Sequence, residues 1–361
     1  MNLATQSPSR CNRCILPAHP DLITLDFGGV CNFCNDYKPI QYKGETALIN
    51  LLDTHRNRDS EYDCIVNISG GRDSAFTLLK LVKDYKMRVL AVNYQNPFVD
   101  KQAEENIASM VNILKVRLVQ FRLVNHIHER MLKNNVLAWF KRPDPAMVPV
   151  ICIGCKIIWP QILKIAKEND IGCIINGGNP YEYTTFKKEL LGVAQQTGLV
   201  STYILNLFGL VKGAFANLAY VKPQFLPVTV KAFLFANQYS IGSRLLGRNV
   251  QRIDLFHYIP WHENEVLSRI QAELSWKYPQ GLESTWRFDC KLSHLKDVMY
   301  LYSLGITEKD DFYAKMVREN KMTRAEALKR ITVENKPHPE IIDDIFRQLG
   351  IEEINAFRLA H

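Results

Sequence analysis

The chain has 361 residues, of which 47% are hydrophobic and 23% are charged. This length and composition predict one large α/β domain with smaller attachments, and they exclude a low-complexity or repeat protein. The 45 basic residues exceed the 37 acidic ones by a net charge of +8, which favours anionic partners such as nucleotides, sugar nucleotides or RNA. The basic residues are scattered, so the charge alone selects none of these partners.

Three features argue for a cytoplasmic protein without a membrane span. The segment Met1–Pro8 is polar and does not resemble a secretory signal. The apolar stretch Tyr203–Ala219 is short for a bilayer span and is interrupted by polar residues, including Lys212. Six of the nine cysteines lie in Cys-x-x-Cys pairs, which in a reducing compartment indicate metal ligation or redox chemistry. We therefore expect a cytoplasmic protein without a membrane span.

Residues 1–43 form the first predicted unit, a loop-rich module with two Cys-x-x-Cys pairs. Sixteen residues separate Cys11-x-x-Cys14 from Cys31-x-x-Cys34, a spacing typical of a zinc ribbon. Four thiolates would close a tetrahedral shell around Zn²⁺, so the site is predicted to be structural. A disulfide knot or an unmetallated pair is the alternative.

The range 60–180 alternates short apolar runs with helix-period stretches, as in βαβ units. The predicted strands are Cys64–Ile68, Val89–Asn93, Val116–Leu123 and Cys173–Asn176. The predicted helices between them are Ser74–Tyr85, Gln102–Leu114 and Ile157–Lys167. The pattern predicts a doubly wound parallel sheet.

A polar loop joins the first predicted strand directly to a helix, and it consists of Ser69, Gly70, Gly71, Arg72, Asp73 and Ser74. The glycines let the backbone approach a ligand, and the free N–H groups at the helix start favour phosphate oxygens. Asp73 offers a hard carboxylate oxygen for Mg²⁺. The alternative is a tight turn in which Ser or Asp only caps the helix. A Walker-type Gly-x-x-x-x-Gly-Lys-Ser/Thr sequence is absent.

A second cysteine pair, Cys152-x-x-Cys155, precedes a predicted helix and has no second pair to complete it. Cys290 is the best candidate for a third ligand, since Cys64 and Cys173 lie in apolar strands and are expected to pack there. Three thiolates would suit an iron–sulfur cluster or a second, reactive Zn²⁺. A purely structural thiol pair is the alternative.

Two further ranges complete the chain. Residues 181–260 form a long apolar and aromatic stretch that predicts a helical insertion, either a partner-docking surface or a core element. Residues 261–361 return to amphipathic helices and are expected to complete the active site. Thr307 and Thr323 are predicted N-caps, the latter with Glu326 in a capping-box pattern.

The Ser-Gly-Gly-x-Asp-Ser loop resembles that of the PP-loop ATP pyrophosphatases, which adenylate an oxygen and release pyrophosphate. This resemblance implies ATP as the cofactor bound at Ser69–Ser74. It also implies that Asn93 lies near the adenine. The glycine turn Gly177-Gly178, after a later strand, would lie near the adenylate.

Several segments together resemble the N-acetyl sugar amidotransferases of surface-polysaccharide synthesis, including that of lipopolysaccharide O-antigen. These segments are the two N-terminal cysteine pairs, the Ser69–Ser74 loop, Cys152-Ile-Gly-Cys155, Ile259-Pro-Trp-His-Glu-Asn-Glu265 and Thr285-Trp-Arg-Phe-Asp-Cys-Lys-Leu-Ser-His294. The resemblance implies that the acetamido oxygen of a nucleotide-linked N-acetyl sugar or uronate is adenylated and then replaced by ammonia. It implies Glu263 and Asp289 as catalytic residues beside Asp73, although each, like Glu265 and His294, equally suits a structural role.

Ammonia needs a source, and the chain has neither a cysteine at position 2 nor a Gly-x-Cys-x-Gly nucleophile loop. The resemblance therefore implies delivery by partner proteins like the glutaminase and cyclase of histidine synthesis.

Two rival functions share parts of this pattern. A tRNA 2-thiolation enzyme has the same loop and a Cys-x-x-Cys plus distant cysteine arrangement, and it predicts salt-dependent tRNA binding. No concentrated basic stripe supports it, so no nucleic-acid partner is expected. A non-enzymatic zinc-ribbon adaptor is the second rival, and the intact loop argues against it.

Overall fold

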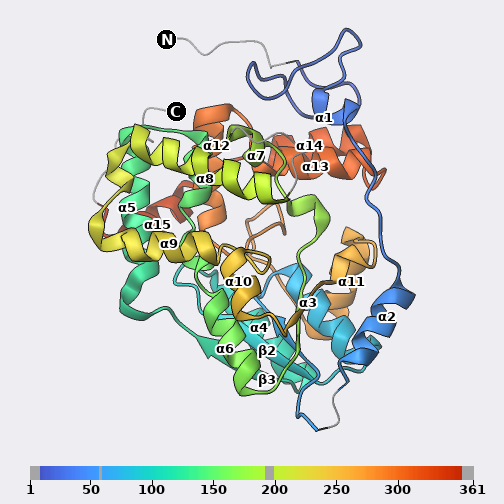
Figure 1. The fold of residues 1–361 in the computed structure, drawn as a ribbon. Coiled ribbons are helices and arrows are strands. Elements are labelled where there is room, and N and C mark those ends of the chain that lie inside the picture. Colours follow the sequence, from blue (N-terminus) through green and yellow to red (C-terminus); the bar gives the residue numbers. More distant parts are fainter. Residues whose placement is uncertain (1–8, 57–58, 192–198, 352–361) are drawn as a thin grey trace.

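A five-stranded parallel sheet forms the centre of the protein in the computed structural model, which describes residues 9–56, 59–191 and 199–351 (Figure 1). The polar segment Met1–Pro8 and the last residues of the predicted C-terminal range lie outside the described residues. The strands are β1 (Cys64–Asn67), β2 (Val89–Tyr94), β3 (Arg117–Phe121), β4 (Cys173–Asn176) and β5 (Gln251–Asp254). The strand order is β3-β2-β1-β4-β5, with β1 between β2 and β4. The predicted doubly wound α/β fold is therefore confirmed.

The helices include the three that were predicted between the strands. They are α1 (Asn32–Asn35), α2 (Glu45–Thr54), α3 (Arg72–Leu79), α4 (Lys101–Leu114), α5 (Ile127–Lys141), α6 (Trp159–Glu168), α7 (Phe186–Leu190), α8 (Leu199–Ala216), α9 (Leu226–Leu234), α10 (Ile241–Leu246), α11 (Glu263–Leu274), α12 (Leu292–Leu304), α13 (Glu308–Arg318), α14 (Arg324–Glu334) and α15 (Pro339–Leu349).

Both faces of the three central strands, β1, β2 and β4, are buried, which explains why these strands are largely apolar. Successive residues of β1 point to opposite faces. Ile65 packs with Ile162 and other side chains of α6. Val66 packs on the opposite face with Phe76 of α3 and with α4. Helices on both faces fix the sheet as the rigid support of the loops at its strand ends.

Strand β5 lies inside the range 181–260, where the sequence predicted a helical insertion. It pairs with β4, with Asn176 opposite Asp254. Its sequence is Gln-Arg-Ile-Asp, and only its last two residues are buried. A four-residue, mostly polar edge strand gives no periodic signal, so the prediction missed it.

The C-terminal helices begin where the sequence indicated. Thr307 caps α13 and Thr323 caps α14 through their side-chain oxygens. The sequence predicted a reciprocal capping box at Thr323, but the structure has it at Thr307. There, the backbone N–H of Thr307 donates to the Asp310 carboxylate. In the described part of the chain, no helix combines the length and the apolar character needed to cross a membrane.

Candidate active site

The loop after β1 lies at the point where the strand order reverses, between the ends of β1 and β4. Ligands bind outside such switch points in open α/β sheets. Gly70 has a φ of +84°, and a Cβ atom there would lie 2.2 Å from the carbonyl oxygen of Ala103 in α4. Only glycine fits this position.

The first turn of α3 has no side-chain cap. Gly71 is the N-cap residue. The hydroxyls of Ser69 and Ser74 lie 3.2 Å apart, and the backbone N–H of Ser69 donates to Ser74. The simple interpretation, in which Ser or Asp caps the helix, is not what the structure shows. An uncapped helix start beside two hydroxyls suits an anion.

Arg72 extends behind the loop into a buried cage. Its guanidinium donates to Glu263 at 2.7 Å and to Thr285 at 2.9 Å, and it lies 4.8 Å from the ring centroid of Trp261. Glu263 is also bound by Arg330 at 2.5 Å. Burial raises the pKa of Glu263, but the hydrogen bonds and charges of the two arginines outweigh it and lower that pKa.

Glu263 is not among the residues that line the cavity described below. Its contacts make it a partner of Arg72, which begins α3. A direct catalytic role for Glu263 remains a prediction, while a positioning role follows from the geometry.

Asp73 is buried, and both of its carboxylate oxygens are held. Trp261 Nε1 donates to Oδ1 at 2.8 Å and Asn179 Nδ2 donates to Oδ2 at 2.6 Å. Burial raises the pKa of Asp73 to about 6, although Arg72 and these hydrogen bonds act in the opposite direction. Asp73 is therefore a fixed carboxylate that titrates close to neutrality.

The glycine turn after β4 packs directly against α3. A Cβ at Gly177 would lie 2.5 Å from Thr77 Oγ1 and 2.6 Å from the carbonyl oxygen of Asp73. Gly178 follows at the cavity wall. Asn93, at the end of β2, donates to the carbonyl of Ile68 and does not line the cavity. Its predicted place near an adenine remains a prediction.

A cavity of about 370 Å³ opens at these strand ends. It is lined by the loop, the glycine turn and residues from distant segments: Ser69, Gly71, Arg72, Asp73, Ser74, Cys152, Asn176, Gly177, Gly178, Glu182, Thr285, Arg287, Asp289, Cys290, Ser293 and Lys296. The fold therefore brings together segments from residues 69 to 296.

Asp289 and Cys290 reach the cavity because their segment pairs with the chain after β2. Cys290 forms an antiparallel bridge with Val99, and its sulfur accepts from Asn96 Nδ2 at 3.2 Å. A Cβ on Gly71 would lie 3.0 Å from the Asp289 carboxyl carbon. Burial raises the pKa of Asp289, and a hydrogen bond from Ser69 partly offsets this effect.

The three cysteines predicted to form a second metal site lie in one neighbourhood. Cys152 and Cys290 line the cavity, and the charges of both would raise the pKa of the adjacent Cys155 thiol, which burial already raises. Among the described residues, only the N-terminal cysteines bring all their ligand atoms within 4.8 Å of one another. A single zinc ion would therefore require the three sulfurs to move closer together.

One part of the cavity wall, which we call the cationic wall, carries two basic side chains. Arg287 and Lys296 line it, and both contact the buried carboxylate of Glu308, at 2.6 and 3.7 Å. Lys187 pairs with the same carboxylate. Arg287 also pairs at 3.6 Å with Glu182, a second carboxylate that lines the cavity, so three cations are matched with two carboxylates here. Arg287 also has a φ of +50°, and such strained backbones cluster at functional sites.

Sequence reasoning missed this cationic wall, because isolated Lys and Arg residues look like ordinary surface. It also missed the amide chain at the ends of β1, β4 and β5. There, Asn67 donates to Asn176, Asn176 to Gln238, and Gln238 to Asp254, each at 2.7 Å. Polar side chains that end successive predicted strands are the signal that points to such a network.

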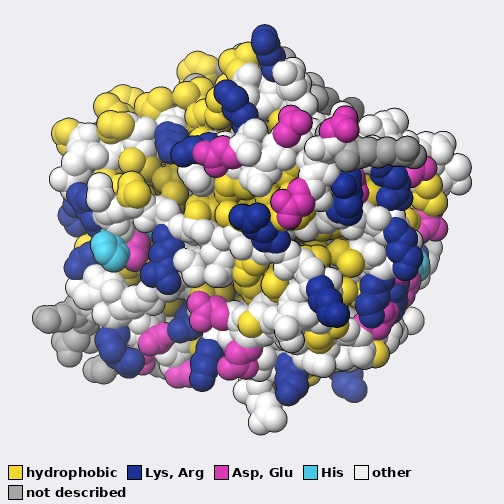
Figure 2. Space-filling view, turned by 90° about the horizontal axis from the view of Figure 1, so that it is seen from below, with side chains coloured by type: hydrophobic (Ala, Val, Ile, Leu, Met, Phe, Trp, Pro, Cys, Tyr) yellow, Lys and Arg dark blue, Asp and Glu magenta, His cyan; other side chains and the backbone are white. Residues whose placement is uncertain are grey.

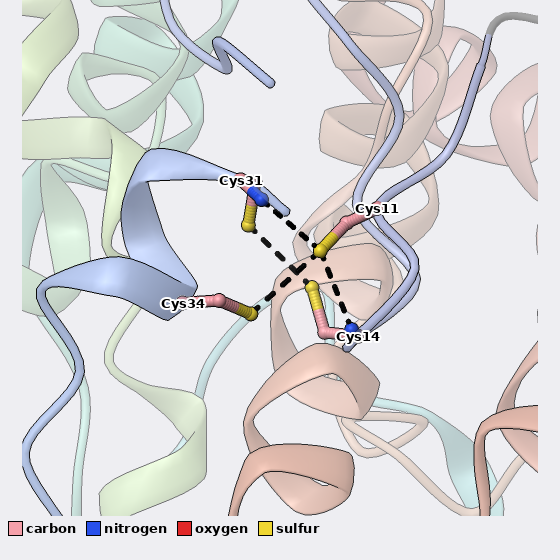
Figure 3. Close-up of side chains that lie close together, drawn as sticks. All are labelled: Cys11, Cys14, Cys31 and Cys34. Atoms are coloured by element: carbon pink, nitrogen blue, oxygen red, sulfur yellow. Dashed lines mark hydrogen bonds between the residues drawn. The ribbon is translucent and has the colours of Figure 1, made fainter. Parts of the chain in front are cut away.

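The four N-terminal cysteines form a separate centre (Figure 3). The Sγ atoms of Cys11 and Cys34 lie 3.8 Å apart, and those of Cys14 and Cys31 lie 3.7 Å apart. A tetrahedron with Zn–S bonds of about 2.3 Å has edges of about 3.8 Å, so the donor set fits Zn²⁺.

Side chains from the C-terminal helices surround this centre. Arg318 of α13 donates to the sulfurs of Cys34 and Cys14 at 3.3 and 3.5 Å. Arg324 of α14 donates to the carbonyls of Cys11 and Cys14. The four-cysteine cluster, whose donor set indicates metal binding, is thus part of the folded body of the protein.

No protein-family model matches the chain. An uncharacterised protein of Methanocaldococcus jannaschii is 22% identical over 173 residues, which are 47% of this chain and 57% of that protein.

Two solved structures are similar to the chain. The NMN synthetase of Francisella tularensis is 13% identical with a TM-score of 0.38, over 80% of this chain and 90% of that one. The U34-tRNA thiolase NcsA of Methanococcus maripaludis, solved with its [4Fe-4S] cluster, is 14% identical with a TM-score of 0.33, over 96% and 89%. At these scores neither likeness carries an argument about this chain.

Proposed function

We propose that the chain is an ATP-dependent, AMP-forming amidotransferase of the PP-loop type. Its substrate is a nucleotide-linked N-acetyl sugar or uronate, and its product carries an acetamidino group. The cavity carries this proposal, since it joins an uncapped, glycine-rich helix start to a cationic wall more than 200 residues away in sequence. The helix start suits the phosphates of ATP, and Arg287 and Lys296 suit an anionic second substrate.

At the loop end, the N–H groups of the first turn of α3 and the hydroxyls of Ser69 and Ser74 would bind pyrophosphate. Asp73 and Asp289 are the carboxylates of this end, and their hard oxygens fit Mg²⁺. The metal would neutralise charge on the departing pyrophosphate. Arg72 and Glu263 would hold the helix start in place from behind.

At the cationic end, Arg287 and Lys296 would hold the phosphate or carboxylate groups of the sugar nucleotide. The acetamido group would then face the α-phosphate of ATP. Its carbonyl oxygen attacks that phosphorus, and the bond to the bridging oxygen breaks with release of pyrophosphate. Ammonia adds to the activated carbon, loses protons, and AMP leaves with the former carbonyl oxygen. The products are the acetamidine, AMP and pyrophosphate.

The ammonia would come from partner proteins that resemble the glutaminase and cyclase of histidine synthesis. This part of the proposal rests on the family resemblance and on the missing glutaminase motifs in the chain.

The decisive experiment combines anaerobically purified protein with ATP, Mg²⁺, ammonium and a panel of UDP-linked N-acetylated sugars and uronates. AMP and the mass of each sugar are followed. Replacement of one acetamido oxygen by NH, with one AMP per product, is the expected result. Absence of sugar-dependent AMP across the panel contradicts the proposal.

A tRNA 2-thiolation enzyme is the second candidate, and the position of Cys152, Cys155 and Cys290 beside the loop favours it. It predicts AMP formation that depends on tRNA and a sulfur donor and falls steeply with salt. The same assay with tRNA in place of the sugar panel separates the two functions.

Lowering the pH is expected to remove activity through Asp73, whose pKa burial raises to about 6. If the carboxylate form is required, AMP formation falls about tenfold per pH unit below that value. Stability changes in the opposite direction. The pKa of Asp73 in the folded protein exceeds the ordinary value of 3.8, so the folded state binds a proton more tightly than the unfolded state. Lowering the pH from about 6 to 3.8 therefore raises the free energy of unfolding. Activity and urea unfolding measured at the same pH values check both signs, and an activity profile that stays flat down to pH 5 contradicts the assignment.

The Lys296→Gln substitution is expected to raise KM for the sugar nucleotide about tenfold or more, because one charge-assisted hydrogen bond is worth ~1.5–3 kcal/mol. KM for ATP should change little, since Lys296 belongs to the proposed sugar-nucleotide site and not to the Ser69–Ser74 loop. Steady-state kinetics with each substrate varied in turn provides the measurement. The exposed Lys164 of α6 supplies the control variant Lys164→Gln. Equal changes in both KM values contradict the two-ended cavity.

A further inference from the structure

The segment from α8 to α10 carries most of the large apolar side chains that the protein exposes. Of the 22 exposed large hydrophobic residues in the described part of the chain, 13 lie between Leu205 and Leu246. Figure 1 shows α8, α9 and α10 on the same side of the molecule. Exposed apolar residues concentrated in this way mark an interaction surface.

These side chains follow helical spacing and face outward. Leu205, Phe208 and Phe215 of α8 are 37%, 67% and 74% exposed and recur at intervals of three and seven residues. The stripe on α9 consists of Leu226, Val230 and Leu234, which are spaced four residues apart. On α10, the exposed residues are Ile241, Leu245 and Leu246. Such stripes normally face a core, but here they face outward.

The charge of this segment is of one sign. No Asp or Glu occurs from position 190 to position 253, although the chain has 37 of them elsewhere. The exposed basic residues between α8 and β5 are Lys212, Lys222, Lys231, Arg244 and Arg248. Figure 2 shows hydrophobic side chains gathered on one side of the lower face, with Lys and Arg and some Asp and Glu beside them. The segment itself is therefore apolar, and every charge that it carries is positive.

We propose that α8, α9 and α10 bind the surface of a bilayer that contains anionic lipids. Helices that lie in a membrane interface combine outward Leu, Val, Ile and Phe with Lys and Arg whose long stems reach the headgroups. Protein–protein interfaces are instead depleted in Lys. This segment contains three Lys residues and no acidic residue. Binding at the bilayer surface needs no membrane-spanning helix, and no helix among the described residues is long and apolar enough to span a membrane.

This surface is connected to the candidate active site. Gln238, between α9 and α10, accepts from Asn176 at the cavity and donates to Asp254. The bound segment would thus hold the cavity close to the membrane surface. The inference stands on exposure and charge and is independent of the proposed reaction.

Flotation of the full chain with lipid vesicles tests the proposal. The protein is expected to float with vesicles of phosphatidylcholine mixed with phosphatidylglycerol, and about tenfold less with phosphatidylcholine alone, since each basic residue near an anionic surface contributes ~1 kcal/mol. The variant Leu245→Asp/Leu246→Asp and the variant Lys222→Glu/Lys231→Glu should each lose at least about tenfold in vesicle binding.

Two control variants carry the same changes elsewhere on the surface. They are Val124→Asp, at a residue that is 76% exposed, and Lys101→Glu, whose side chain is 89% exposed. Both should float like the unchanged protein. All exchanged residues are exposed, so urea unfolding should show a preserved fold.

Three results overturn the proposal. One is the absence of flotation with either vesicle, and another is flotation that the four patch substitutions leave unchanged. The third is a concentration-dependent dimer that Leu245→Asp/Leu246→Asp dissolves while vesicles bind nothing, which would assign the surface to a second copy of the chain.

Discussion

Replacing Gly70 by alanine is expected to reduce ATP-dependent AMP formation on the order of a hundredfold or more. The φ of +84° is strained for any residue with a Cβ atom, and that atom would lie 2.2 Å from the Ala103 carbonyl oxygen and 2.7 Å from its carbon. The loop cannot turn away, because the Gly70 carbonyl is held by Trp276 Nε1 at 2.9 Å and Asn106 Nδ2 at 3.2 Å. Either the loop or α4 must shift. Assays of AMP formation and ATP binding provide the measurement.

Gly281→Ala is the matched control, since Gly281 has a φ of +95° but nothing lies within 4 Å of an added Cβ. It carries the backbone strain without the collision. We expect it to cost about 1 kcal/mol of stability and to keep its activity. If the Gly70 variant folds and forms AMP normally, the loop is not the nucleotide site. If both variants lose activity alike, strain alone explains the loss and the collision with α4 is irrelevant.

The parts of the fold that the sequence predicted are those that depend on local pattern. Strand β1 reads as a continuous apolar run because both of its faces are buried, and α3 begins after a loop of only four residues. Strand β5 has no such run, and its pairing with β4 is a long-range event. Periodicity carries no information about such a pairing.

The residues of the candidate site also divide into those that local sequence spacing predicted and those that only long-range pairing brings together. The four N-terminal cysteines are close in sequence, and their spacing predicted the cluster. Cys290 and Asp289 depend on a bridge between Val99 and Cys290, which links segments almost 200 residues apart. Cys290 was predicted by elimination among the cysteines and Asp289 from the resemblance to a family, but the chain itself gave no local reason for either residue to face the loop.

Glu263 illustrates why residue type alone does not assign a role. A glutamate that binds substrate and a glutamate that binds Arg72 and Arg330 are the same residue type in a sequence. Only the positions of the two guanidinium groups separate these roles, and those positions come from the packing of α3, α11 and α14. The prediction for Asp289 differs because its carboxylate lies against Gly71 at the cavity.

We predict that the four-cysteine centre holds zinc and that removing this metal destabilises the protein by at least about 5 kcal/mol, because the binding energy of structural zinc is folding energy. Its cysteines are at most 1% exposed and belong to the main hydrophobic core, so losing the metal leaves a buried polar cluster. Cys14→Ser should lose one equivalent of zinc and unfold at lower urea concentration. Elemental analysis and urea unfolding provide the measurements. Cys152→Ser is the control and should keep this zinc, whereas an unchanged zinc content in Cys14→Ser contradicts the assignment.

The charge of the centre can be tested through Arg318. Zinc with four thiolates carries a net negative charge, and the guanidinium that donates to Cys14 and Cys34 compensates it. Arg318→Met should therefore destabilise the zinc-loaded protein. After zinc removal the four cysteines would be neutral thiols, and the buried guanidinium would lose its anionic partners at the sulfurs. The same substitution should then stabilise the protein or leave its stability unchanged. This reversal of sign, measured by urea unfolding with and without chelator, would distinguish a metal centre from four packed thiols. Equal destabilisation in both states would show that Arg318 acts only through packing.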